Sequence, residues 1–152
     1  MAGLYFDEFK VGQVFKHEIR RTVTEADNVW YSTATCNPAA LHLDEHYCRE
    51  HTVFGQRIVN SGFTFGLMIG LSVADTTLGT TVANLGMDEV RFPAPVFHGD
   101  TVRSETEVLD LRESKSRPDQ GIVTFHHRAY NQDDVLVGQC KRSALMMKRP
   151  AA

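Results

Sequence analysis

The stretch IVNSGFTFGLMIGLSVA, residues 58–74, decides the fold of this chain. Its apolar side chains are spread all around a helical wheel, and a helix that is apolar on every side is expected to be buried on every side. Glycine recurs at every fourth position, at 62, 66 and 70, which would let a strand surface approach the helix axis closely. We therefore predict one long buried helix wrapped by a sheet.

The second half of the chain supplies that sheet. Four successive runs show partial alternation of apolar and polar residues, the pattern of antiparallel strands, and they lie at 80–92, 100–112, 121–130 and 135–148. Their connectors are rich in the turn formers Pro, Gly, Asn and Asp. An earlier run at 11–22 is a further strand. The sequence thus predicts an α+β fold, with a curved antiparallel sheet around a central helix.

A polar region lies between the first strand and the long helix. Thr24 and Asp27 have the spacing of a capping box, and apolar residues at helical spacing follow them, which predicts a helix at 25–34. Pro38 should end that helix, because the residue before a proline is pushed out of the helical conformation. We expect an irregular loop at 37–43 and a short helix at 44–50. So many polar residues together indicate a surface or a site.

Composition excludes several classes of protein. The chain has 152 residues, 42% hydrophobic and 23% charged, which suits one globular domain at residues 1–152. A net charge of -3 gives no reason to expect a nucleic-acid partner. No apolar run approaches the roughly 20 residues of a membrane span, and no secretory signal is readable. Three cysteines without a CxxC pair favour a reducing cytoplasm.

The residues that could do chemistry are few. Seven histidines include no spacing typical of three or four zinc ligands, so we expect no metal site. Phosphate-binding glycine loops and the GxSxG nucleophile motif are missing, so we expect no cofactor held by them. What remains is the polar loop with Asn37 and His42, followed by the start of the long helix at Ser61 and Gly62. Unpaired N–H groups at a helix start can hold a developing negative charge on an oxygen.

Two runs resemble a known family. NPAALHLDEHYCREHTVFGQRIVNSGF, residues 37–63, and RFPAPVFHGDTV, residues 91–102, resemble the signatures of the MaoC-like, R-specific enoyl-CoA hydratases, and the resemblance extends roughly over residues 6–147. It implies a hot-dog fold and a hydro-lyase that adds water reversibly to a 2-enoyl-CoA thioester. Coenzyme A then arrives as part of the substrate, and no separate cofactor is needed.

The resemblance also implies roles for individual residues. In that family an Asp and, five residues later, a His activate the water; here His42 falls on the histidine and Asn37 on the aspartate. The family's I-V-H-G helix start matches residues 58–61, so Asn60 replaces its histidine and Ser61 its glycine. We expect His42 to be the general base and acid and Asn37 to orient the water. The N–H of Ser61 or Gly62 would meet the thioester oxygen.

A narrower resemblance concerns the substrate. The NS helix start and the segment SKSRPD, residues 114–119, are similar to those of mesaconyl-CoA and itaconyl-CoA hydratases, which act on branched dicarboxylic acyl-CoAs. A second carboxylate calls for a guanidinium, for which Arg57 and Arg91 are candidates, and Asn60 is a further substrate-binding candidate. Lys115 and Arg117 could hold the coenzyme A phosphates. Each of these four cations also fits an ordinary solvated surface residue.

Two other functions stay open. The same fold carries thioesterases, but those place an Asp or Glu on the buried helix or its facing strand, and residues 63–73 contain none. A non-catalytic module that binds acyl-CoA or protein is the third possibility. Asp44 and Glu45 are either helix caps or the missing carboxylate near His42. Since hot-dog chains with one buried helix usually pair edge to edge, the resemblance implies a homodimer or a dimer-based higher oligomer.

Overall fold

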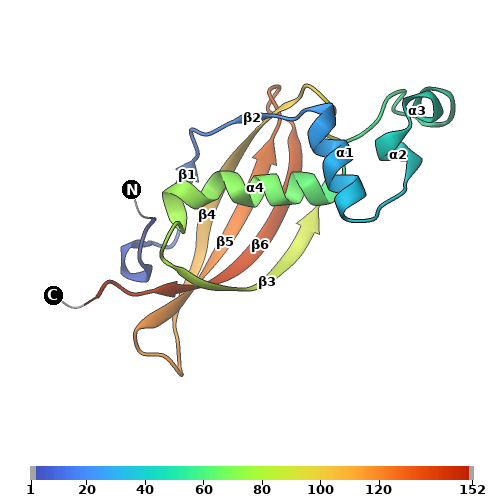
Figure 1. Cartoon of the computed structure of the whole chain (residues 1–152). Helices are drawn as coiled ribbons and strands as arrows, with labels where there is room; N and C mark the ends of the chain where they lie inside the picture. The colour runs from blue at the N-terminus through green and yellow to red at the C-terminus, as the bar shows by residue number, and fades with distance from the viewer. Residues whose placement is uncertain (1–2, 151–152) are drawn as a thin grey trace.

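A six-stranded antiparallel sheet curves around one long helix in residues 3–150, the part of the chain that the computed structural model describes (Figure 1). The long helix, α4, is Ser61–Thr76. The shorter helical elements that precede it are η1 (Phe6–Glu8), α1 (Glu25–Ala34), α2 (Ala40–Leu43) and α3 (Glu45–His51). The strands are β1 (Val14–Lys16), β2 (Arg21–Thr22), β3 (Thr81–Arg91), β4 (Thr101–Glu113), β5 (Gln120–Tyr130) and β6 (Leu136–Met147).

The four predicted strands are confirmed, but their order is not that of a simple meander. The sheet runs β1-β4-β5-β6-β3, with β2 also paired to β4, so β3 lies beside β6 and not beside β4. Residues 92–100 therefore cross from one side of the sheet to the other. Alternation shows that a run is a strand without naming its neighbour. The single strand expected at 11–22 is instead two short strands, β1 and β2.

The long helix differs from its prediction in one respect. Its buried residues are Thr64, Met68, Leu71, Ser72 and Thr76, which lie toward the sheet, while Gly66 and Gly70 are exposed with no atom within 4 Å of an added Cβ. The expectation of burial on every side, with glycines against the strands, is wrong for this single chain. The reason is that the sheet covers only one side of α4 (Figure 1). No helix in the described part of the chain is long and apolar enough to span a membrane.

The core follows the strand alternation closely. Along β5, Val123, Phe125, His127 and Ala129 are fully buried while the residues between them are half-buried. Two apolar clusters result, one around Met68 of α4 and one around Phe125 and the N-terminal phenylalanines. Burying alternate residues of each strand under α4 is what holds the helix across the sheet.

The polar region is more helical than predicted. Helix α1 is confirmed at 25–34, and the Thr24 hydroxyl accepts a hydrogen bond from the Asp27 N–H as expected. The loop expected at 37–43 is wrong in part, because residues 40–43 form the helical turn α2. The Asn37 side chain accepts the Ala39 N–H at 3.0 Å and so turns the chain back into a helix after Pro38. Asp44 then caps α3, as predicted.

Candidate active site

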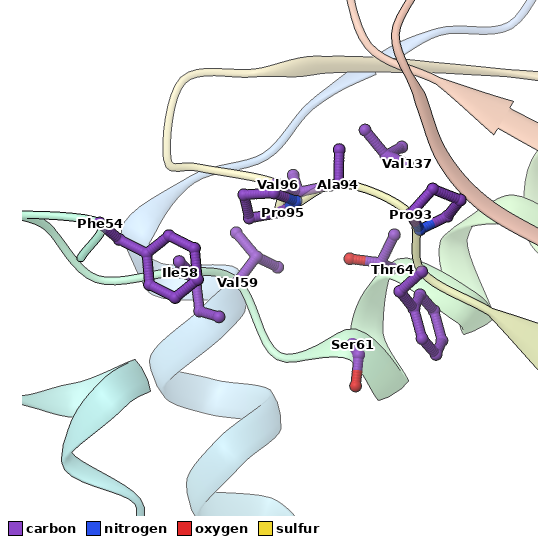
Figure 2. A pocket seen from close by; sticks show the side chains of 11 residues that line it. Phe54, Ile58, Val59, Ser61, Thr64, Pro93, Ala94, Pro95, Val96 and Val137 are labelled. Atoms are coloured by element: carbon purple, nitrogen blue, oxygen red, sulfur yellow. The ribbon is translucent and has the colours of Figure 1, made fainter. Parts of the chain in front are cut away.

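An apolar pocket opens at the N-terminal end of α4. This end of the helix is the one next to α1 (Figure 1). Its volume is about 350 Å³. Figure 2 shows Ser61 and Thr64 at the start of α4, with the chain before the helix on one side and residues 93–96 opposite. The lining residues are Phe54, Ile58, Val59, Ser61, Thr64, Phe92, Pro93, Ala94, Pro95, Val96 and Val137. A mostly apolar pocket with a few hydroxyls suits a small organic group.

His42 does not line this pocket itself but contacts one of its lining residues, and it is 9% exposed. Its Nδ1 is 3.0 Å from the carbonyl oxygen of Ile58, a residue that lines the pocket. A carbonyl can only accept a hydrogen bond, so Nδ1 carries the hydrogen, and in the neutral ring Nε2 has the free lone pair. No residue among 3–150 hydrogen-bonds to that Nε2. The hydrogen bond to Ile58 thus fixes the tautomer of the neutral His42 ring.

The residue that holds this arrangement together is Asn28, which the sequence analysis missed. Its Nδ2 is 3.2 Å from the His42 carbonyl oxygen, 3.1 Å from that of Ile58 and 3.0 Å from Nε2 of His98. Its Oδ1 accepts the Asn60 N–H at 2.9 Å. Asn28 therefore joins three segments that are distant in sequence, around residues 42, 58–60 and 98.

A weak signal for Asn28 existed in helix α1. The apolar spacing at 26, 29, 30 and 34 predicts that this face is buried, but Trp30 is 67% exposed while Asn28 and Ser32 are fully buried. The helix thus turns a polar face inward. A polar pair four residues apart on one helix face is the pattern that could have pointed to it.

The start of α4 is capped by Asn60. Its Oδ1 accepts the Gly62 N–H at 3.0 Å, and its Nδ2 donates to the Ser32 hydroxyl at 3.3 Å. The Gly62 N–H, one of two predicted oxyanion donors, is therefore already partnered. Within residues 3–150 the Ser61 N–H has no acceptor. The Tyr31 hydroxyl lies against Gly62, where an added Cβ would be 2.5 Å from it.

Of the remaining predicted site residues, some lie near the pocket and others lie far from it. Asn37 uses its side-chain oxygen in the turn to Ala39, and no hydrogen bond links it to His42 in the described residues. Arg91 ends β3 directly before Phe92 of the pocket. Lys115 and Arg117 lie in the β4–β5 hairpin, at the opposite end of the sheet from α1 (Figure 1). Within one chain, these two cations are not brought to the site.

Arg57 is already engaged by acidic side chains. Its guanidinium is 2.7 Å from Glu25 and 3.0 Å from Glu45, and its side chain is 11% exposed. Burial by itself lowers the pKa of Arg57, but the two carboxylates outweigh it and raise that pKa, while Arg57 lowers the pKa of Glu45. Glu45 is thus a structural partner of Arg57, and Asp44 is a helix cap.

His98 completes the polar cluster around Asn28. Burial and then the positive charge of Arg57 lower the pKa of its imidazole. The neutral ring is the form that can accept a hydrogen bond from the Asn28 amide. In residues 3–150 no three His, Cys, Asp or Glu side chains converge as a metal site.

A second polar network lies at the C-terminal end of α4. The His17 ring is 2.7 Å from Asp75 through Nδ1 and 2.8 Å from the Thr106 hydroxyl through Nε2, and Thr106 is also 2.9 Å from Nδ1 of His127. Asp75 does place a carboxylate on the long helix, two residues beyond the segment scanned for one. It is held by His17, at the opposite end of the helix from the pocket.

Comparison with known proteins identifies the chain's relatives. The family model described as "MaoC like domain" matches residues 8–130. A mesaconyl-CoA hydratase of Cereibacter sphaeroides is 32% identical over 99% of this chain and 43% of its own length. A beta-methylmalyl-CoA dehydratase of Chloroflexus aurantiacus is 31% identical over 97% of this chain and 41% of its own. The chain thus spans less than half the length of these curated relatives.

A solved structure shows the same fold. A Mycobacterium tuberculosis protein described as having a double hotdog fold superposes with a TM-score of 0.88 at 27% identity, over 99% of this chain and 46% of that one. The predicted wrapping of an antiparallel sheet around a helix is therefore confirmed. From the family match and these relatives, the chain belongs to the MaoC-like dehydratase family and has the hot-dog fold.

Proposed function

We propose that the protein catalyses the reversible hydration of a 2-enoyl-CoA thioester, with a branched dicarboxylic acyl-CoA such as mesaconyl-CoA as its substrate. The observation that carries the proposal is the buried His42, whose Nδ1 hydrogen is held by the carbonyl of the pocket-lining Ile58 and whose Nε2 has no hydrogen-bond partner in residues 3–150. The two curated relatives, a mesaconyl-CoA hydratase and a beta-methylmalyl-CoA dehydratase, support this substrate class.

The chemistry needs a base, a proton donor and a stabiliser of negative charge. In the hydration direction, His42 Nε2 takes a proton from water as the water oxygen bonds to the β-carbon. The electron pair of the double bond moves to the α-carbon and thioester oxygen, and the protonated His42 then returns a proton to the α-carbon. The Ser61 N–H meets the thioester oxygen, a contact worth about 2.7–4 kcal/mol in other acyl chemistry. Asn37 remains the candidate for orienting the water.

The second carboxylate of such a substrate needs a cation near the pocket. Arg57 is bound by Glu25 and Glu45, which leaves Arg91 as the better of the two predicted partners. Arg91 directly precedes Phe92 at the pocket. Asn60 acts through the helix start and not as a direct ligand of the substrate. Coenzyme A is part of the substrate, and the reaction needs no further cofactor.

The assembly we propose is a homodimer or an oligomer built from dimers, in the cytoplasm. Lys115 and Arg117 lie far from the pocket of their own chain, so they would reach coenzyme A phosphates only at the site of another copy (Figure 1). The exposed Gly66 and Gly70, which have no atom within 4 Å of an added Cβ, also leave room for a close partner on the outer side of α4.

The experiment is a panel of crotonyl-, mesaconyl- and itaconyl-CoA, followed by the absorbance of the enoyl thioester and by a thiol reagent. Loss of the enoyl band without thiol release supports hydration, and the preferred substrate supports or rejects the dicarboxylic class. Thiol release would instead indicate a thioesterase. No reaction with any substrate, together with binding of acyl-CoA, would support a non-catalytic module.

A further inference from the structure

Asn28 is fully buried and makes four polar contacts, all of them to segments that carry the candidate site. We propose that Asn28 is a positioning residue that fixes the base His42 and the start of helix α4 in one geometry. This inference rests on the proposed function for its catalytic meaning, but its structural content is independent of any substrate.

The orientation of the Asn28 amide follows from its neighbours. The Asn60 N–H is a donor and needs an acceptor, so the oxygen of the amide must face it, at 2.9 Å. The other end of the amide faces two carbonyl oxygens, of His42 and Ile58, which only accept. Exchanging the amide oxygen and nitrogen would oppose donor to donor and acceptor to acceptor. The amide therefore donates toward His42 and accepts from α4.

The donating side of Asn28 controls His42 in two ways. It contacts the backbone carbonyl of His42 at 3.2 Å, and at 3.1 Å it contacts the Ile58 carbonyl, the same oxygen that receives the Nδ1 hydrogen of His42. The Asn28 amide thus fixes both the backbone of His42 and, through the Ile58 carbonyl, its ring. Such a partner behind a functional histidine fixes both the tautomer and the direction of the ring.

The accepting side of Asn28 controls the helix start. Asn28 accepts the Asn60 N–H and so fixes the position of Asn60, whose own side chain caps the Gly62 N–H. Asn60 directly precedes Ser61, whose N–H has no acceptor in residues 3–150. The base and the oxyanion donor come from segments 19 residues apart in sequence. One side chain therefore sets their separation, and misplacement of reacting groups by about 1 Å can cost about 100-fold in rate.

His98 makes the arrangement sensitive to acid. Its Nε2 can accept from the Asn28 amide only while that nitrogen carries no hydrogen. Protonation would place a donor against a donor and displace the amide from Ile58. The charged groups that act on His98 are Arg57, which opposes its protonation, and Glu25 and Glu45, which favour it. His98 is therefore expected to remain neutral while the site is assembled.

The test compares two variants of Asn28 with one matched control. Asn28→Asp keeps an oxygen for the Asn60 N–H but replaces the amide nitrogen that faces His42 with a second oxygen. Asn28→Ala removes both the accepting oxygen and the donating nitrogen. Thr76→Val, at the far end of α4, removes a buried hydroxyl that bonds the Ser72 carbonyl, and serves as the control for lost stability. The first readout is nitrogen-15 NMR of the His42 ring, which reports the tautomer without any substrate.

We expect wild type and the control to show His42 with hydrogen on Nδ1, and both Asn28 variants to lose that preference. With a substrate that the wild type hydrates, kcat should fall about 100-fold in both Asn28 variants while KM changes little. The acid limb of the kcat profile should move in the variants and not in the control. If Asn28→Asp does not fold, Asn28→Ala carries the same test.

An unchanged His42 tautomer in a folded Asn28 variant would overturn the proposal, and so would a control that lowers kcat as much as the variants do. Failure of the proposed function looks different. A wild type that hydrates no enoyl-CoA, but whose His42 tautomer depends on Asn28, would reject the reaction and retain the positioning role.

Discussion

A polar network that contains histidine lies at each end of α4, but the two networks differ in how the ring nitrogens are bound. At the N-terminal end, His42 has one ring nitrogen bound to the carbonyl oxygen of Ile58, a residue that lines the pocket, and the other without a hydrogen-bond partner in residues 3–150. At the C-terminal end, both ring nitrogens of His17 are bound, to Asp75 and Thr106. A histidine with a free nitrogen at a pocket can exchange protons with a substrate, whereas one with both nitrogens engaged in the core holds elements together.

The second network resembles a hydrolytic triad only in its residue types. Carboxylate, imidazole and hydroxyl follow one another from Asp75 through His17 to Thr106, within hydrogen-bond distance. The Thr106 hydroxyl is fully buried and shared with His127, so no substrate carbonyl can approach it. A catalytic triad and a structural hydrogen-bond network can contain the same residue types in the same order. They differ in whether a substrate can reach the hydroxyl.

The largest difference between the two ends should appear in turnover. His42→Ala should lower kcat for the best enoyl-CoA substrate by about 10²–10⁴-fold, the usual contribution of a general acid-base residue. His17→Ala, its counterpart at the other end, should keep kcat per folded molecule. Initial rates from the enoyl absorbance, normalised to the folded fraction, give the answer. Equal losses in both variants would contradict the division of roles.

For the free energy of unfolding we expect the reverse order, with a larger loss in His17→Ala than in His42→Ala. His17→Ala removes the partner of Asp75, leaves the Thr106 hydroxyl with His127 alone, and opens a cavity in the core, so we expect a loss of about 2–4 kcal/mol in the free energy of unfolding. Urea denaturation monitored by circular dichroism measures it. His42→Ala should cost less, because its Nε2 has no partner among residues 3–150 to lose. A larger loss for His42→Ala would reverse the comparison.

Acid should weaken the C-terminal network through His127. Burial, and then the charge of Arg142, lowers the pKa of His127 from 6.5 to about 3. Since the unfolded chain takes up this proton first, stability is full above pH 6.5 and declines as the pH falls toward 3. Between pH 7.5 and 5.0 this one group should remove about 2 kcal/mol from the free energy of unfolding.

The matched variant for that pH effect is His127→Asn, whose amide can replace Nδ1 at the Thr106 hydroxyl and does not titrate. All other titrating groups are common to both proteins, so the difference between the two pH-dependent losses isolates His127. A wild type and variant with parallel pH profiles would show that His127 is not the origin of the effect.

The smallest expected effect separates the two candidate arginines. Arg57→Leu removes two ion pairs whose partners remain in solvent, and it should leave the ratio of kcat/KM for mesaconyl-CoA to that for crotonyl-CoA unchanged. Arg91→Leu should lower that ratio, because only the dicarboxylic substrate uses the cation. Steady-state kinetics with both substrates decide between them. A drop in the ratio for Arg57→Leu alone would return the role to Arg57.

Local pattern accounts for the elements that were predicted correctly. Helix α1 and strands β3 to β6 lie within about two residues of their expected bounds, because capping and alternation act between near neighbours. The position of β3 next to β6, the helical turn at 40–43 and the exposed face of α4 were not predicted. Each depends on which segments meet in space, which periodicity does not encode.

The residues of the candidate site also fall into those that the sequence could select and those that only the structure shows. His42 could be selected because an imidazole in a recognisable motif has chemistry of its own, and Ser61 because a helix start has unpaired N–H groups whatever the side chain. Asn28 has only the weak signal of a polar pair with Ser32 in the sequence, since the role we propose for it consists of contacts with His42, Ile58, Asn60 and His98. Arg57 was a candidate ligand from its residue type, and only the structure shows that Glu25 and Glu45 already pair with it.

The amino-acid sequence by itself determined most of the elements and the family, and it selected His42 as the candidate base, because these depend on residue type and on spacing along the chain. Within residues 3–150, tertiary structure alone decided which nitrogen of His42 has a hydrogen-bond partner, that the Ser61 N–H has none, and which cation is already paired with carboxylates. These properties are set by hydrogen bonds and ion pairs between segments distant in the chain. A hydrogen bond or ion pair acts only when folding brings its partners within about 3 Å.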